Sequence, residues 1–209
     1  MNSRPSPSPS PSPSPSPRPY RMQARAASAA ATAERILDAA VEVYWEHDGD
    51  ELSLDEVARR AEVTVQTVIR RFGGKQGLFT AAVDRETERV RRERGEAPVG
   101  DVAGAVHVLV SSYETTGDRM LVVLAEEQRI PSTAVILDRG RALHREWCAR
   151  VFAPALTGLT GNDRKRRLAQ LVAVCDVYTW KLLRRDAGLS RRQTEIAMVE
   201  LLHPIAQAS

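Results

Sequence analysis

Residues 53–72 read SLDEVARRAEVTVQTVIRRF, and this stretch decides the fold expected for the first third of the chain. Ser53 and Glu56 fit a capping box, which predicts a short helix over Leu54–Ala61. Thr64 is a suitable N-cap for a second helix over Val65–Phe72, which a pair of glycines ends. Two short helices joined by about three residues have the spacing of a helix-turn-helix.

The second of these helices has one face for the core and one for a partner. Val68 and Phe72 lie four residues apart and are expected to point inward together with Val57. A recognition helix reads bases with its N-terminal residues, and here Gln66 suits adenine while Thr67 offers a hydroxyl and a methyl group. The candidate DNA contacts are Ser53, Thr64, Val65, Gln66, Thr67, Arg70, Arg71 and Lys75. The same pattern also fits a helical hairpin in a bundle with a merely solvated polar face.

Helical spacing continues through the rest of the chain, and no stretch alternates as a strand would. The first helix is expected over about 30–47, with Asp48-Gly49-Asp50 as its stop. Further helices are expected over about Lys75–Arg94, 102–113, Met120–Arg129, Ser132–Phe152, Asp163–Arg185 and Arg191–Leu202, the last opened by a capping box of Ser190 and Gln193. The fold class expected is therefore all-α with about nine helices.

Composition excludes several classes of protein. The chain has 209 residues, of which 43% are hydrophobic and 27% charged, the mixture of a soluble globular protein. No apolar stretch is long enough to span a bilayer and the first residues show no apolar h-region of a signal peptide, so no membrane association and a cytoplasmic location are expected. Cys148 and Cys175 cannot form a disulfide framework and are expected to be small buried side chains.

The N-terminal segment differs from the rest in composition and charge. Residues 5–19 are essentially a Ser-Pro repeat, which favours a disordered chain biased to polyproline II. Residues 1–33 contain four arginines and no acidic residue, although the whole chain carries a net charge of only +3. Residues 1–27 are therefore expected to form a disordered tail whose charge suits either a polyanion partner or simple solubility.

Three stretches together resemble a known family. They are TAERILDAA at 32–40, SLDEVARRA at 53–61 and TVIRRFGGKQGLF at 67–79, and they look like the N-terminal domain of TetR-family transcriptional regulators. The resemblance implies a DNA-binding head over residues 28–82 and a helical effector-binding and dimerisation domain over residues 83–209. It also implies a homodimeric, ligand-responsive repressor of a palindromic operator in double-stranded DNA, with an unknown small-molecule effector.

The resemblance has departures as well as matches. Lys75 stands where the family has a phosphate-contacting lysine. Glu62 replaces the usual glycine of the turn, where a left-handed backbone costs a non-glycine residue about 1 kcal/mol. Ile69 stands where the family usually has a phosphate-binding tyrosine, and Arg71 where it often has a histidine. Because of Ile69 and Glu62, the alternative of a helical small-molecule or protein-binding module that no longer reads DNA stays open.

Candidates for the effector pocket and the dimer interface come from the later helices. The pocket candidates are apolar or polar-tipped residues that could equally be core: His107, Tyr113, Met120, Trp147, Phe152 and Tyr178. The interface candidates lie on the last two expected helices: Val172, Val177, Trp180, Leu183, Met198 and Leu201. A central helix of a monomeric bundle would show the same broad apolar stripe.

An enzyme is not expected from this sequence. It shows no glycine-rich phosphate loop and no nucleophile beside a base. The four histidines have no metal-ligand spacing with each other or with the cysteines. No cofactor and no metal are therefore expected.

Overall fold

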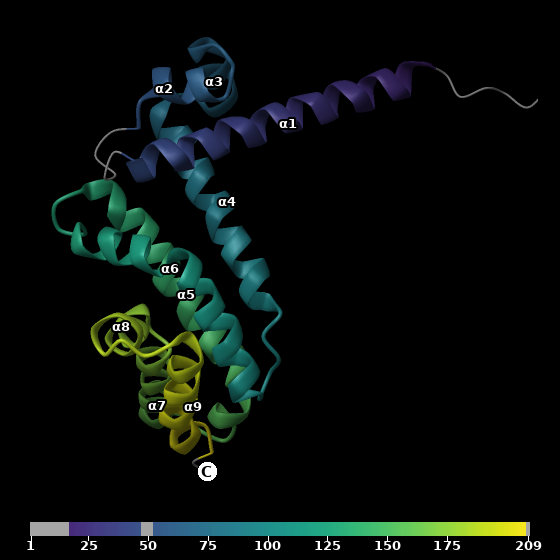
Figure 1. The fold of residues 1–209 in the computed structure, drawn as a ribbon. Helices are drawn as coiled ribbons and strands as arrows, with labels where there is room; N and C mark the ends of the chain where they lie inside the picture. Colours follow the sequence, from purple (N-terminus) through teal and green to yellow (C-terminus); the bar gives the residue numbers. More distant parts are fainter. Residues whose placement is uncertain (1–16, 47–51, 208–209) are drawn as a thin grey trace, which may run out of the picture.

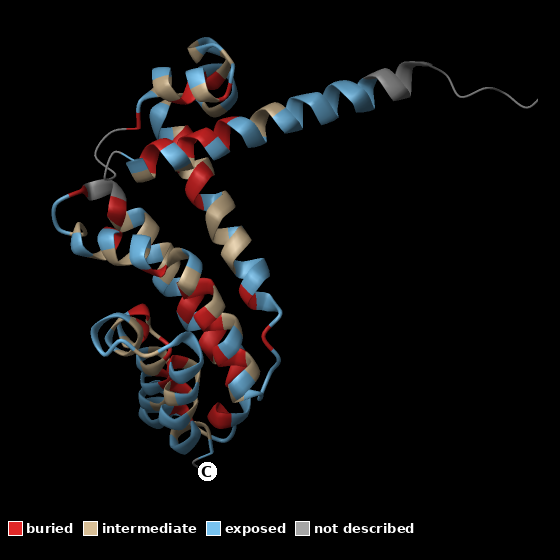
Figure 2. Cartoon of the chain, in the orientation of Figure 1, coloured by how far each residue is buried: buried red, intermediate tan, exposed pale blue. Residues whose placement is uncertain are grey.

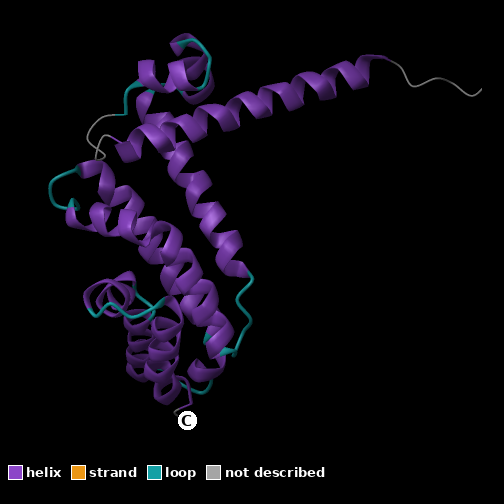
Figure 3. Cartoon of the chain, in the orientation of Figure 1, coloured by secondary structure: helices purple, strands orange, loops and turns teal. Residues whose placement is uncertain are grey.

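The computed structural model describes residues 17–46 and 52–207, which form helices and short connections without any strand (Figures 1 and 3). The helices are α1 (Pro17–Glu46), α2 (Leu54–Arg60), α3 (Val65–Phe72), α4 (Lys75–Gly95), α5 (Val102–Ala125), α6 (Pro131–Val151), the 3-10 turn η1 (Ala153–Leu156), α7 (Gly161–Val174), α8 (Val177–Lys181), the π-helical η2 (Leu182–Asp186) and α9 (Arg191–Gln207). The all-α prediction is confirmed. None of these helices combines the length and the apolar character needed to cross a bilayer.

Two separate apolar cores hold the molecule together (Figure 2). The core of the head is built from α1, α2, α3 and the start of α4, and its fully buried side chains include Ile36, Val43, Val57, Val68 and Leu78. The second core lies among α5 to α9 and includes Leu109, Val151, Leu171, Trp180 and Met198. Each such side chain contributes roughly 1.5–3 kcal/mol by leaving water. Helix α4 runs from the head to the second core and so connects them (Figure 1).

Helix α1 starts earlier than the sequence indicated. The first helix was expected from about residue 30 and a disordered tail through residue 27, but α1 begins at Pro17. The alanine-rich segment 24–33 favours a helix, and Pro17 and Pro19 fall in the first turn, where a missing amide costs no hydrogen bond. This first half of α1 projects away from the molecule and is exposed from residue 22 to 31 (Figures 1 and 2). Residues 1–16 and the expected stop at 48–50 lie outside the described residues.

Helix α5 joins two segments that were expected to be separate helices. It continues through Gly117 and Met120 to Ala125, so the predicted helix over Met120–Arg129 is the end of α5. Gly117 does not end the helix because its missing side chain makes room for the ring of Trp180, which a Cβ at this position would meet at 2.6 Å. Pro131, expected as the stop of that helix, instead opens α6 at the first helical position.

The helix expected over Asp163–Arg185 is divided into three. Helix α7 ends at Val174, and the side chain of Asp176 accepts a hydrogen bond from the amide of Tyr178 at 2.9 Å, which caps a new start for α8. The chain then widens into the π-helical η2, where the amide of Ala187 donates to the carbonyl of Leu182. An aspartate that competes for backbone amides explains the break.

The last helix confirms its predicted start and extends past its predicted end. The amide of Gln193 donates to the Ser190 hydroxyl at 3.3 Å, and the amide of Ser190 donates to the Gln193 side chain at 3.0 Å, which completes the capping box. Helix α9 continues beyond Leu202 and includes Pro204. Arg167 of α7 donates to the carbonyl of Ile205 at 2.9 Å, and this bond holds the extended end in place.

Candidate nucleic-acid interface and ligand cavity

The turn between α2 and α3 brings the two helices together at a steep crossing. Ala58 and Ala61 are buried and small, so the helix backbones approach closely. Glu62 has a φ of 54°, the left-handed backbone that the sequence required of it. The amide of Val63 then donates to the carbonyl of Ala58 at 2.9 Å and closes the turn. Ser53 caps α2 by accepting from the amide of Glu56 at 3.3 Å.

Helix α3 has the predicted bounds and the predicted faces. The Thr64 hydroxyl accepts from the amide of Thr67 at 3.2 Å and so caps the helix. Val68 is fully buried in the head core, whereas Gln66 is exposed and Thr67 is half-buried. Ile69 stands 40% exposed on the same outer surface. The side chains assigned to bases are therefore on the outside of a helix fixed by its cap and its buried face.

The remaining candidate contacts lie beside this surface. Ser53, Thr64, Arg70, Arg71 and Lys75 are exposed, and Val65 is half-buried. Arg71 also donates two hydrogen bonds, of 3.0 and 2.6 Å, to the carbonyl of Ala29 in α1. This contact links the end of α3 to the projecting half of α1, which sequence reasoning did not indicate because the partner is a backbone atom 42 residues away.

Glu56, in the first turn of α2, is neutralised by its neighbours. The carboxylate of Glu56 accepts from Arg59 at 2.6 and 2.9 Å and from Arg60 at 2.7 Å, rather than reaching back in a reciprocal capping box. Hydrogen bonds from Arg59 and then Arg60 lower the pKa of Glu56 to about 2. Arg60 also pairs with Glu46 of α1, so this cluster joins α2 to α1 as well.

Comparison with known proteins identifies the head. Residues 36–82 match the family described as bacterial regulatory proteins, tetR family. Over these residues the head is similar to that family. It is 36% identical over 84 residues to an uncharacterized HTH-type transcriptional regulator from each of two strains of Mycobacterium tuberculosis. These matches cover 40% of the chain and 41% of each relative, so the chain spans about two fifths of the length of those relatives.

The fold beyond residues 36–82 also has a solved counterpart. The chain is similar to the crystal structure of a transcriptional regulator from Rhodococcus sp. Rha1, with a TM-score of 0.60 and 23% identity. That similarity covers 84% of this chain and 96% of the other. It extends the likeness in fold, though not in function, to the C-terminal helices.

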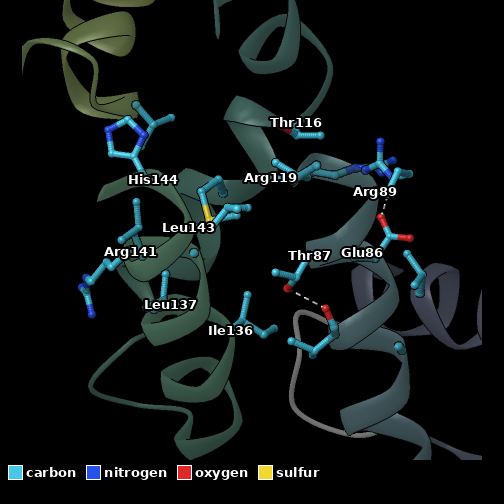
Figure 4. A pocket seen from close by; sticks show the side chains of 18 of the residues that line it. Glu86, Thr87, Arg89, Thr116, Arg119, Ile136, Leu137, Arg141, Leu143 and His144 are labelled. Carbon is cyan, nitrogen blue, oxygen red and sulfur yellow. Dashed lines mark hydrogen bonds and ion pairs between the residues drawn. The ribbon is translucent and has the colours of Figure 1, made fainter. Parts of the chain in front are cut away.

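A cavity of about 300 Å³ lies where the head meets the C-terminal helices (Figure 4). Tyr44 and Trp45 of α1 and Phe79 of α4 line it from the head, and residues of α5 and α6 line it from the other side. In Figure 4, Arg119 and Arg89 lie on one side of the cavity, and His144 and Arg141 lie on the other. A molecule bound here would touch both the head and the C-terminal helices.

The structure places only two of the six pocket candidates on this cavity, Tyr113 and Met120. Trp147 and Phe152 are buried in the second core, where the indole of Trp147 donates to the carbonyl of Arg94 at 2.9 Å. His107 is exposed and lies 3.2 Å from a carboxylate oxygen of Glu195. Tyr178 is half exposed at 50% on the surface of α8. The sequence alone did not show which face of each helix borders the cavity, because the cavity lies between helices.

The interface candidates also divide into core and surface. Val177, Trp180 and Met198 are buried within the chain's own core, so they have no exposed area to offer a partner. Val172 and Leu183 are half-buried, and Leu201 is 48% exposed. The large apolar side chains exposed at this end of the molecule are Tyr178, Leu182, Ile196 and Leu201. The broad apolar stripe that gave the interface candidates therefore packs mainly into the core of the chain's own C-terminal domain.

The two cysteines are buried, as predicted. Hydrogen bonding between their thiols lowers the pKa of Cys148 and raises that of Cys175. Among the residues described by the structure, no cluster of histidine, cysteine and acidic side chains could hold a metal ion.

Proposed function

We propose that this chain is a sequence-specific DNA-binding transcriptional regulator. The observation that carries the proposal is the outward placement of Gln66 and Thr67 on α3, in a domain that matches the TetR family. Helix α3 would lie in the major groove, where Gln66 pairs with adenine and Thr67 contacts a neighbouring base. The caps at Ser53 and Thr64 support this role because they fix the angle at which α3 meets the groove.

The phosphate contacts in this proposal come from the last turn of α3 and the start of α4. Arg70 and Lys75 are exposed, and Lys75 stands at the start of α4, where free backbone amides favour an anion. The projecting half of α1, with Arg25 exposed and Ala29 held by Arg71, extends the basic surface beyond the head. Arginines of this segment and of the tail before it would follow the backbone into a flanking minor groove.

The proposed regulator acts as a homodimer on a palindromic operator. The exposed apolar side chains of α8, η2 and α9, which are Tyr178, Leu182, Ile196 and Leu201, support an interface at the end of the molecule opposite the head. A twofold axis there would carry two recognition helices to half-sites about one turn of DNA, ~34 Å, apart. Such a spacing explains why a palindrome is the expected operator.

The proposed regulator responds to a small molecule and acts as a repressor. The cavity supports this part because Tyr44 and Trp45 of α1 and the middle of α4 line it together with α5 and α6. A ligand shifts the balance between two head positions only if it binds one of them better than the other. A ligand in this cavity contacts both domains, so its affinity depends on the position of the head.

Selection of bound sites from random duplex DNA tests the proposal. The purified chain is expected to enrich a palindrome and to protect it from cleavage, and to elute as a dimer in size-exclusion chromatography. A monomer that enriches no sequence would contradict the proposal and favour the alternative, a helical module whose head no longer reads DNA. Replacing Arg70 with alanine is expected to weaken binding evenly across sequences and to reduce the salt dependence of affinity.

A further inference from the structure

Arg94, in the last turn of α4, is a buried cation without an acidic partner. Its residue is only 7% exposed, and an arginine keeps its charge at any physiological pH. Its Nε donates to the hydroxyl of Ser112 at 3.3 Å, and its guanidinium lies 5.0 Å from the centre of the Tyr113 ring. No carboxylate of the described residues comes within 4.0 Å of it. Burial of an unpaired charge is costly, so this arrangement favours an anion from outside the chain.

Arg94 borders the cavity, and the other arginines there are already paired or exposed. Arg89 pairs with Glu86 and Glu93, and Arg141 pairs with Glu127 at 2.6 Å. The two carboxylates that line the cavity belong to Glu86, which is paired, and Asp176, which caps α8.

Arg119 is exposed and lies over the ring of Trp45 at 5.7 Å from its centre. It stands at the same cavity as Arg94 but not in a buried position. Among the described residues, Arg94 is therefore the buried cation of the cavity wall that is left to pair with a ligand.

The rest of the cavity wall is largely apolar. Its aliphatic side chains are Val41, Leu52, Val83, Val90, Met120, Leu124, Ile136, Leu137, Leu143, Val172 and Val177. Two buried polar atoms of cavity-lining residues, the Tyr44 hydroxyl and Nδ1 of His144, have no hydrogen-bond partner among the described residues. A volume of about 300 Å³ is at the small end of the usual range for ligand pockets.

We propose that this cavity binds a small organic monocarboxylate with an apolar body, whose carboxylate pairs with the guanidinium of Arg94. The apolar body lies against the aliphatic walls between α4, α5 and α6. A planar guanidinium matches a carboxylate with two parallel hydrogen bonds, and a low-polarity wall strengthens them. The backbone of Arg94 is held in place because its carbonyl accepts from Trp147 and Arg150. This inference gives a chemical class to the effector of the proposed regulator and rests on that proposal only for its regulatory meaning.

Direct binding to the full-length protein, without DNA, tests the inference. The probes are octanoate, decanoate and phenylacetate, each compared with its neutral alcohol, and the readouts are calorimetry and the shift in melting temperature. At least one acid is expected to bind about ten-fold or more tightly than its alcohol. The inference is overturned if no acid binds, or if the alcohols bind as well as the acids.

Three variants locate the site. Arg94→Met is expected to remove the preference for acid over alcohol, whereas Arg141→Gln, which changes another arginine of the cavity that Glu127 already neutralises, is expected to keep it. Gly140→Leu covers the case in which Arg94→Met fails to fold. Gly140 lines the cavity on α6 and a Cβ there would meet nothing within 4 Å, so a leucine should fill the space and abolish binding while Arg94 is intact.

An unchanged acid preference in a folded Arg94→Met protein, or in Gly140→Leu, would overturn the inference. If the protein binds acids but selects no DNA sequence, the inference about the cavity holds and the proposed function fails. The two ideas are therefore separately testable.

Discussion

Gly117 and Gly140 allow the same substitution to be tested in opposite environments. A Cβ on Gly117 would lie 2.6 Å from Cζ3 and 2.8 Å from Cη2 of Trp180. That ring is fully buried, its Nε1 donates to Glu114 at 3.2 Å, and the guanidinium of Arg185 lies 4.5 Å from its centre. The ring therefore cannot retreat without loss of these contacts. Gly140, also inside a helix, has nothing within 4 Å of the same added atom.

The magnitudes follow from two opposed effects. Glycine to alanine inside a helix gains about 1 kcal/mol of stability from backbone propensity. Overpacking against a fixed ring costs about 1–3 kcal/mol. Gly117→Ala is therefore expected to lose about 1 kcal/mol net, and Gly140→Ala to gain about 1 kcal/mol. For a chain of this size each kcal/mol moves the melting temperature by about 2–4 °C, so the two variants should differ by about 4–8 °C.

Urea unfolding followed by circular dichroism measures both variants against the parent. Equal m-values are expected, because neither change alters the surface exposed on unfolding. Combining Gly117→Ala with Trp180→Leu should remove part of the overpacking cost, which a double-mutant cycle would reveal as coupling. If Gly117→Ala is as stable as Gly140→Ala, the packing of α5 against α8 described above is wrong.

Two further changes test the C-terminal domain. Ser190→Ala removes the side-chain cap of α9 and should cost about 1 kcal/mol in urea unfolding, whereas no loss would show that the capping box contributes nothing. Burial raises the pKa of Glu114, but hydrogen bonds from Arg184 and Trp180 outweigh it, so the pKa is lowered overall. The stability due to ionised Glu114 is thus fully present above about pH 4.3 and is lost as the pH falls through the lower folded pKa. In Glu114→Gln, the free energy of unfolding should fall less as the pH is lowered through this range. An equal fall in both proteins would contradict this role of Glu114.

Local signals in the sequence predicted the head accurately. The left-handed backbone of Glu62 was implied by the family resemblance. The bounds of α3, its cap at Thr64 and the capping box at Ser190 all depend on residues within a few positions of each other. Interactions of that range can be recognised from spacing alone. The same holds for the inward position of Val68.

The features that sequence reasoning missed depend on residues far apart in the chain. Gly117 falls between two helices that were expected to be separate, and only its contact with Trp180 explains why α5 continues through it. Trp180 itself looked suited to a dimer interface because a helix buried by its own domain carries the same apolar pattern as one buried by a partner. Arg94 was not singled out at all, since an arginine near a helix end is ordinary unless its burial is known.

The account depends most directly on Gln66 as a base-reading residue of α3. Its measurement is the affinity of the protein and of Gln66→Ala for the selected operator and for every single-base change in one half-site. Gln66→Ala should lose about 1–3 kcal/mol of discrimination at one base pair and keep it elsewhere. Gln170→Ala, an exposed glutamine of α7 outside the head, should match the parent throughout. Full discrimination at every position in Gln66→Ala would contradict the claim that α3 reads the bases through this side chain.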